Sequence, residues 1–540
     1  MTPTLRRVAL AAVLLLGVAL RLQYVDRPFD HRLLNPWRQS DYLALTRNFA
    51  REDANLFYPR IDWRGDTPGY AEMELPLVPW LGAWLWRLHG PAVVGQRALA
   101  AALEIGALLL FAALARRVLP EAGALAATLL FALNPLLIVL ATSLQPEPLL
   151  NLACVAAVLL LWRWLAAPRP ATLLAAAALA GLAMLAKLPA AYLGLLFAYA
   201  VLRRLGLAAL RRPEVWGAAL IAALPPLAWY SWAHRFWLVY GNSLGLSNES
   251  HLIGADVLWP PTFLLGIGMW ETLGVFTPAG LLLAVAALRL PWARIELPVV
   301  WYAAVAVFYV LAGRTTGDQW SYYYHSLSVA PAALLMGAGY ASFRPFPPLK
   351  KGGQGGFPDP GSVSKSPPTP LFQRGEGRPF QKGEQRTEYR WAGTALLAAT
   401  AGLMLAAGWY LGQRRDHGDA VERQLYECSR ALAPLVPADA RIVVRGGTKV
   451  DEHGHPVAYN ASMVFAWMDR KGFNYAAEDF GDATLAAIAA RGGRYWLATP
   501  EDFAAPGMAA AAARYRKLRD CGERMALFDL QAAPAAGGAG

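Results

Sequence analysis

The residues best suited to chemistry lie in the segment Arg38-Gln39-Ser40-Asp41-Tyr42, a polar stretch that follows the first apolar segment of the chain. A carboxylate such as Asp41 can accept a proton, and a guanidinium such as Arg38 can bind a phosphate. At a membrane surface this pairing is suited to chemistry on a lipid-linked substrate. The alternative is a solvated loop in which Arg38 and Asp41 form an ordinary ion pair.

Further acidic residues lie in other polar segments. Glu72 and Glu74 precede a short Pro-rich apolar stretch, and Glu147 lies in the segment Leu144-Gln145-Pro146-Glu147-Pro148. The two earlier acids are also explained by the dipole of a following helix. Glu147 is also explained as a cap of the helix that the adjacent proline starts.

Basic and aromatic residues accompany these acids. Lys187 ends an apolar segment, where it is suited to a lipid phosphate, although extension toward the membrane surface also explains it. Tyr324 and His325 lie in a tyrosine-rich segment that an interfacial aromatic belt would explain, and a single histidine is a weak sign of proton transfer. The first polar loop, a large outer loop of residues 23–74, contains the basic residues Arg38, Arg47, Arg60 and Arg64.

Several sequence motifs are absent. The chain has no Gly-rich phosphate loop ahead of a helix, no His/Cys cluster at metal-ligand spacing and no Gly-x-Ser-x-Gly elbow. We predict no cofactor with certainty, and a divalent cation held by the acidic residues stays open.

Composition indicates an integral membrane protein. Of the 540 residues, 56% are hydrophobic and 16% are charged, whereas soluble proteins carry about 25% charged residues. The net charge of +12 comes largely from basic residues between apolar segments, such as Arg116-Arg117 and Arg203-Arg204. This pattern is typical of membrane topology and not of nucleic-acid binding.

We predict an all-α polytopic membrane protein of about eleven transmembrane helices, since a span needs about 20 apolar residues. The apolar stretch from Leu75 to His89 is too short, and we interpret it as a juxtamembrane or re-entrant helix. The positive-inside rule then places the active site and the polar C-terminal region on the outer, periplasmic side of a bacterial inner membrane. The predicted spans are 8–22, 92–115, 121–141, 148–166, 171–187, 188–204, 214–233, 270–289, 296–313, 323–343 and 391–411.

The polar C-terminal region predicts a small extracytoplasmic α/β domain. Its patterns indicate helices near 418–435 and 461–470 and strands at 441–445, 494–498 and 525–530. Cys428 and Cys521 both lie there and can form one disulfide in an oxidising compartment. The expected regions are 1–343 for the catalytic transmembrane part, 344–390 for a disordered basic cytoplasmic loop, 391–411 for the last span, 412–530 for the α/β domain and 531–540 for a flexible tail.

Three segments resemble glycosyltransferase family 39, which holds protein O-mannosyltransferases and lipid A aminoarabinose transferases. They are Trp37-Arg38-Gln39-Ser40-Asp41, the segment from Asn55 to Asp62, and Glu72 to Pro76. The resemblance implies a membrane-embedded enzyme of the GT-C type that uses a polyprenyl-phosphate sugar. Two departures are Leu75, where the aminoarabinose transferases have a lysine, and Tyr324-His325-Ser326-Leu327-Ser328, where the family has Tyr-Tyr-x-Leu-Pro.

The resemblance and the residues together predict an inverting glycosyltransferase with Asp41 as general base. The acceptor is a protein, a lipid or a glycan of the envelope, the other partners are membrane lipids, and no nucleic acid is involved. The rival hypotheses are a flippase or transporter of a lipid-linked saccharide and a non-catalytic envelope scaffold. The expected substrate-binding residues are Arg38, Gln39, Tyr42, Arg60, Arg64, Glu74, Glu147, Lys187, Tyr324 and His325.

Overall fold

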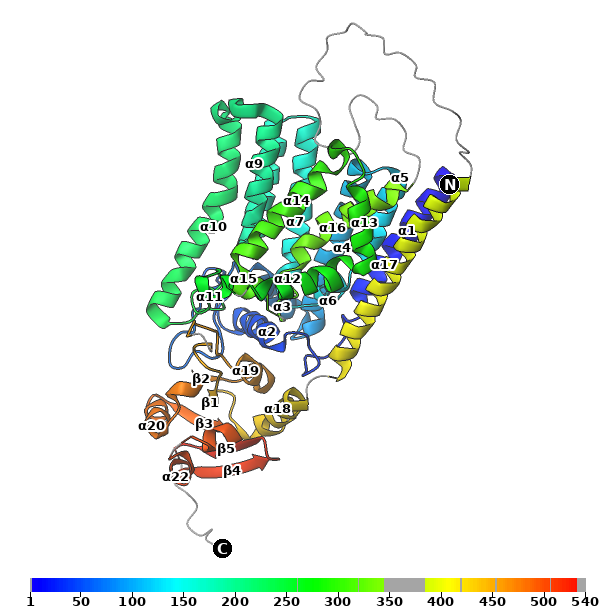
Figure 1. The fold of residues 1–540 in the computed structure, drawn as a ribbon. Helices are drawn as coiled ribbons and strands as arrows, with labels where there is room; N and C mark the ends of the chain where they lie inside the picture. Colours follow the sequence, from blue (N-terminus) through cyan, green and yellow to red (C-terminus); the bar gives the residue numbers. More distant parts are fainter. Residues whose placement is uncertain are drawn as a thin grey trace, which may run out of the picture.

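A computed structural model places a helical bundle at one end of the molecule and a smaller region with a β-sheet at the other (Figure 1). The structure describes residues 2–259, 261–318, 320–343, 384–417, 420–451, 454–505 and 507–531. The predicted basic loop 344–390 lies almost wholly outside the described residues, as does most of the predicted tail 531–540.

Each predicted span overlaps with a helix or with a pair of helices. Residues 121–141 form two helices instead of one, because Asn134 ends the first and caps the second, accepting hydrogen bonds from the backbone N–H groups of Leu136 (3.1 Å) and Leu137 (3.4 Å). The helices of the bundle are α1 (Pro3–Leu22), α4 (Val93–Val118), α5 (Glu121–Leu133), α6 (Pro135–Leu140), α7 (Glu147–Ala166), α8 (Pro170–Ala186), α9 (Tyr192–Leu205), α10 (Pro213–Tyr240), α13 (Pro278–Ala287), α14 (Trp292–Leu311), α16 (Ser326–Ser342) and α17 (Glu384–His417).

The predicted span 270–289 is not one straight helix. The segment α12 (Phe263–Met269) with the π-helix η3 (Trp270–Phe276) meets α13 at an angle of 84°. Thr277 lies at the break with a φ of 65°, and its hydroxyl accepts a hydrogen bond from the Gly280 N–H at 3.3 Å. A bend of this size turns the backbone away from the direction in which a straight span would continue.

The count of eleven spans is not confirmed. Within the described residues, five helices are long and apolar enough to cross a membrane, or six if the bent pair is one span. Several of the others are shorter than 18 residues, as α8 and α16 are. Helix lengths and apolar composition still support an integral membrane protein.

Helix α2 of the first polar loop and the apolar helix α3 that follows the loop lie at the end of the bundle that faces the sheet (Figure 1). Helix α2 (Pro36–Arg51) begins at Asn35, whose side chain accepts a hydrogen bond from the Arg38 N–H, and Pro36 fills the first helical position. Helix α3 (Leu77–His89) corresponds to the predicted short apolar helix. Both helices pack against each other, and α3 also packs against α4.

The C-terminal region contains a five-stranded mixed sheet of order β2-β1-β3-β5-β4. Strand β1 is parallel to β2 and β3, whereas β5 is antiparallel to β3 and β4. The strands at β2 and β4 were not predicted. Their bounds and those of the helices around them are α18 (Ala420–Leu432), β1 (Arg441–Arg445), α19 (Ser462–Met468), β2 (Lys471–Tyr475), α20 (Asp482–Ala490), β3 (Gly493–Ala498), α22 (Met508–Ala512), β4 (Arg516–Cys521) and β5 (Met525–Asp529).

A disulfide joins Cys428 of α18 to Cys521 of β4, with a Cα–Cα distance of 5.6 Å. It links residues 93 positions apart in the sequence. The pairing considered from the sequence is thus present, and it fixes α18 to the edge strand of the sheet.

Candidate functional site

The segment with Arg38 and Asp41 is a buried helix and not a solvated loop. Helix α2 is polar on average, yet twelve of its residues are buried. Arg38 and Asp41 do not pair with each other, because Arg38 extends to a different carboxylate. This buried helix carries four of the predicted site residues, Arg38, Gln39, Asp41 and Tyr42.

Glu74 is the partner of Arg38. The Arg38 guanidinium lies 2.8 Å from Glu74 Oε1, and the Tyr42 hydroxyl donates to the same oxygen at 2.5 Å. Glu74 is buried and lies two residues before Pro76, the N-cap of α3, so it is not in the first turn of that helix. Burial alone would raise the pKa of Glu74, but the cations Arg38 and Lys187 outweigh that effect and lower it.

A second buried ion pair joins Lys187 to Glu147 Oε1. Glu147 is the first residue of α7 and its side chain does not cap the helix. Lys187 is 4% exposed and therefore does not extend to the membrane surface. Its ammonium lies 4.1 Å from the ring centre of Tyr323 and 4.3 Å from that of Tyr324, which stabilises the cation further.

Together these residues form a buried cluster of two cations and two carboxylates, Arg38, Lys187, Glu74 and Glu147, with Tyr42, Tyr323 and Tyr324 around them. Glu249 adds another carboxylate beside it: a Cβ built on Gly245 would lie 3.2 Å from Glu249 Oε2 and 3.3 Å from Arg38 Nη1. Fixed cations in a site with little water are suited to a phosphate, because Coulomb attraction strengthens as the dielectric constant falls.

Asp41 is 1% exposed and accepts hydrogen bonds from three side chains. Oδ1 accepts from the Ser462 hydroxyl at 2.6 Å and from the Trp63 indole at 2.9 Å, and Oδ2 accepts from Asn460 at 3.3 Å. Burial raises the pKa of Asp41 to about 7, although the hydrogen bonds from Ser462 and Trp63 oppose the rise. A carboxyl group with a pKa near neutrality is suited to act as a general base.

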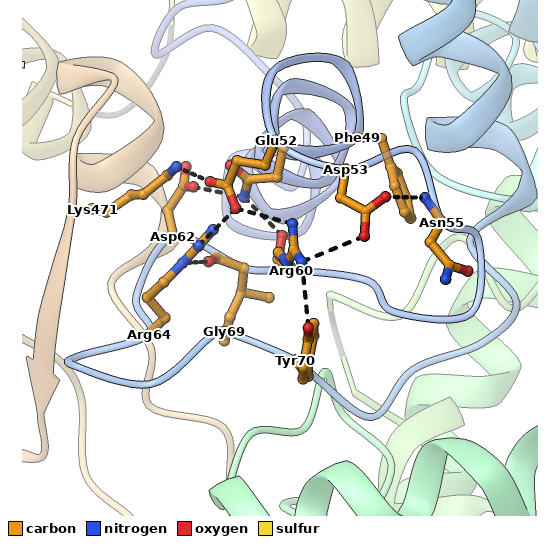
Figure 2. A network of polar contacts seen from close by, with 12 residues as sticks. Phe49, Glu52, Asp53, Asn55, Arg60, Asp62, Arg64, Gly69, Tyr70 and Lys471 are labelled. Carbon is orange, nitrogen blue, oxygen red and sulfur yellow. Dashed lines mark hydrogen bonds and ion pairs between the residues drawn. The ribbon is translucent and has the colours of Figure 1, made fainter. Parts of the chain in front are cut away.

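Arg60 and Arg64, predicted as substrate ligands, lie in another network, which Figure 2 shows. Glu52 lies 3.4 Å from the Arg60 guanidinium and 3.0 Å from that of Arg64, and it also pairs with Lys471 of β2. Arg64 further donates to the backbone carbonyl of Ile61 at 2.6 Å. These contacts hold the first polar loop in shape and connect it to the sheet.

Two other predicted residues are also outside the cluster. Gln39 donates to the Leu34 carbonyl at 2.7 Å and accepts from the Leu144 N–H at 3.4 Å, so it connects α2 to the segment before Glu147. His325 is buried, with Nδ1 2.7 Å from Glu271 Oε1 and Nε2 3.0 Å from the Thr316 carbonyl. The structure therefore brings six of the predicted residues together in the cluster: Arg38, Tyr42, Glu74, Glu147, Lys187 and Tyr324. Asp41 lies on the same helix as Arg38 and Tyr42 but has its own hydrogen-bond partners.

Sequence reasoning missed Trp63, Asn460 and Ser462 around Asp41, and Tyr323 and Glu249 in the cluster. Tyr323 is adjacent to a predicted residue, and Trp63 follows the segment that resembles the family. Asn460 and Ser462 carry no local signal, because they are ordinary polar residues more than 400 positions from Asp41.

The acidic residues do not form an evident metal centre. Among the described residues there is no group of three or more His, Cys, Asp or Glu side chains that could hold a metal ion. The paired carboxylates at this site already face cations, as Glu74 faces Arg38.

The chain is similar to known proteins both in part of its sequence and in its fold. Residues 67–232 match the family described as dolichyl-phosphate-mannose-protein mannosyltransferase. This segment contains Glu74, Glu147 and Lys187 but not Asp41. A search of curated protein sequences gave no match.

Solved structures share the fold over nearly the whole chain. ArnT from Cupriavidus metallidurans in the apo state has a TM-score of 0.57 at 14% identity, and the form bound to undecaprenyl phosphate has 0.56 at 15%, with 98% of both chains covered in each case. The mycobacterial arabinofuranosyltransferase AftD has a TM-score of 0.52 at 14% identity, covering 99% of this chain and 42% of AftD. The resemblance to the mannosyltransferase family that the sequence predicts is thus found again over residues 67–232, and the fold of nearly the whole chain is shared with these solved structures.

Proposed function

We propose that this membrane protein transfers a sugar from a polyprenyl-phosphate donor to an acceptor on the outer face of a bacterial inner membrane. The observation that carries the proposal is the buried cluster of Arg38, Lys187, Glu74 and Glu147, next to a helix that also bears a carboxylate with a pKa near 7. The mannosyltransferase family match over 67–232 and the ArnT structure bound to undecaprenyl phosphate support the same donor class.

The donor phosphate would bind against the Arg38 guanidinium and the Lys187 ammonium. As the bond between the anomeric carbon and the phosphate oxygen breaks, negative charge grows on that oxygen. Arg38 and Lys187 stabilise this charge, while Glu74 and Glu147 hold the two cations in place by their ion pairs. The aromatic rings of Tyr323 and Tyr324 cover the ammonium of Lys187 and keep water from it.

Asp41 would activate the acceptor. A hydroxyl of the acceptor loses its proton to the Asp41 carboxylate while its oxygen attacks the anomeric carbon from the side opposite the phosphate. One displacement of this kind inverts the anomeric configuration. Because the base acts only when it is deprotonated, transfer rises with pH through the pKa of about 7 and falls about tenfold per pH unit well below it.

The test is sugar transfer by purified protein in detergent, using a panel of radiolabelled polyprenyl-phosphate sugars with crude envelope acceptors. Asp41→Asn keeps the shape of the side chain and removes the base, so we expect a loss of about 10²- to 10⁴-fold. Asp62→Asn is the matched control, because Asp62 is a nearby buried carboxylate that accepts from Asn48 at 2.9 Å and lies outside the cluster. Both variants are measured above pH 8, where Asp41 is already deprotonated and the effect of Asp62 on its pKa does not change the rate.

Loss of transfer in Asp41→Asn with near-normal transfer in Asp62→Asn supports the proposal. Equal transfer by Asp41→Asn and the unsubstituted protein would remove Asp41 from the role of base. Absence of transfer from every donor would favour the flippase or scaffold hypothesis instead.

A further inference from the structure

The C-terminal region reaches the candidate base directly. Ser462, the first residue of α19, and Asn460, just before it, both donate hydrogen bonds to the Asp41 carboxylate. Both are buried. Two of the three hydrogen-bond donors to Asp41 therefore come from the C-terminal region, and one, Trp63, comes from the first polar loop.

These two residues are themselves held in place by a chain of hydrogen bonds. The Trp37 indole donates to the Asn460 carbonyl at 2.7 Å, and the Asn460 amide donates to the Ser462 hydroxyl at 2.6 Å. The Ser462 hydroxyl thus accepts from one neighbour and uses its single proton on Asp41. A hydroxyl restricted on both sides has little freedom to turn away from the carboxylate.

The contact between the two ends of the chain continues along the loop that carries Trp63. Gly65 N–H donates to the Gly472 carbonyl at 2.7 Å, and Gly472 N–H donates to the Asp62 carbonyl at 3.0 Å. Arg51 of α2 lies 2.8 Å from Asp469, which follows α19. This backbone pairing and this ion pair hold α19 and β2, and with them the preceding 460–462 segment, against α2 and the loop after it.

We propose that Asn460 and Ser462 are positioning residues, which hold the Asp41 carboxylate in its reactive orientation and make the C-terminal region a working part of the active site. The inference rests on the proposed function, because it assigns a role to the neighbours of the proposed base.

The distribution of hydrogen bonds over the two carboxylate oxygens indicates which oxygen can accept a proton. Oδ1 takes two short bonds, from Ser462 and Trp63, whereas Oδ2 takes one long bond, from Asn460. Oδ2 is therefore the oxygen with more capacity to accept a proton from an acceptor hydroxyl. Ser462 fixes which oxygen that is by occupying the other.

Burial raises the pKa of the base, and the same contacts act against that rise. The ionisable groups that act on Asp41 are Arg38, which favours its anion, and Asp62, which opposes it. The Ser462 hydrogen bond also favours the anion, so its removal raises the pKa of Asp41. A base with a higher pKa is protonated over a wider pH range, and transfer would begin at a higher pH.

The experiment measures the pH profile of kcat/KM for sugar transfer in the full-length protein carrying Ser462→Ala, Ser462→Thr or Asn460→Ala. Ser462→Ala should move the rising limb to higher pH, with about a tenfold loss near pH 6 that shrinks above pH 8, and the donor KM should stay the same. Ser462→Thr keeps the hydroxyl and should restore the profile in large part. Asn460→Ala should lower kcat, because it releases the Ser462 hydroxyl. Ser429→Ala is the control, since Ser429 is a buried serine of α18 in the same region.

A profile of Ser462→Ala that coincides with that of Ser429→Ala, in a protein that Asp41→Asn inactivates, would overturn this inference and leave the proposed function intact. Full transfer by Asp41→Asn would instead overturn the proposed function, and this inference with it. A loss in Ser462→Ala that is equal at every pH and is shared by Ser429→Ala would indicate damage to the fold and would also count against a positioning role.

Discussion

The buried ion pair between Lys187 and Glu147 offers a test that separates stability from chemistry. Lys187→Met removes the charge and keeps most of the side-chain length. It leaves the Glu147 carboxylate without its cation. This carboxylate is fully buried, and its second oxygen, Oε2, has no hydrogen-bond partner. Removing one partner of a buried pair costs about 3–5 kcal/mol, because the remaining charge is buried alone.

That loss predicts a large change in kinetic stability. If the pair is broken before the rate-limiting step of unfolding, about 3 kcal/mol shortens the half-time of thermal inactivation in detergent by about 100-fold. The double variant Lys187→Met/Glu147→Gln has no unpaired charge and should recover most of that half-time. Replacement of a buried pair by neutral groups is often nearly neutral for stability.

Activity should follow a different order. Because we assign the Lys187 ammonium to the leaving phosphate, the double variant should stay impaired in sugar transfer even where its stability has recovered. Release of polyprenyl phosphate and the inactivation half-time, measured on the same preparations, check this. A double variant that is as stable and as active as the unsubstituted protein would refute the assignment and make the pair a purely structural contact.

Two further predictions concern the C-terminal region and the loop that contacts it. Arg64→Gln should change the donor KM by less than about twofold but make the protein more sensitive to limited proteolysis, because Arg64 pairs with Glu52 and not with the cluster. A large rise in KM with unchanged proteolysis would show that Arg64 is a substrate ligand. Cys428→Ser/Cys521→Ser should destabilise the C-terminal region by up to about 4 kcal/mol and make it more sensitive to limited proteolysis, since the disulfide closes a loop of 93 positions. Cys154→Ala, at the free buried cysteine of α7, is the control and should leave the proteolysis pattern of that region unchanged. Identical patterns for the unsubstituted protein and both variants would contradict the stabilising role of the disulfide.

Much of the architecture follows from local sequence. Long apolar segments can satisfy their backbone hydrogen bonds in a membrane only as helices, and so each predicted span overlaps with a helix. Local composition also predicted the start of α7 near Pro148 and the strands β1, β3 and β5. The span count was harder to obtain, because breaks such as those at Asn134 and Thr277 depend on capping and on packing with neighbouring helices.

The sequence by itself determined that the protein is a membrane protein, and it singled out acidic and basic residues between apolar segments, of which Asp41, Glu147 and Lys187 are buried in the structure. Only the tertiary structure decided how they pair. Arg38 lies three positions from Asp41 yet pairs with Glu74, and Lys187 pairs with Glu147. Asp41 accepts a hydrogen bond from Ser462, which lies 421 positions away in the sequence. The physical reason is that a buried charge is stable only where packing supplies a partner, and packing joins segments whose separation in the chain carries no information about their distance in space.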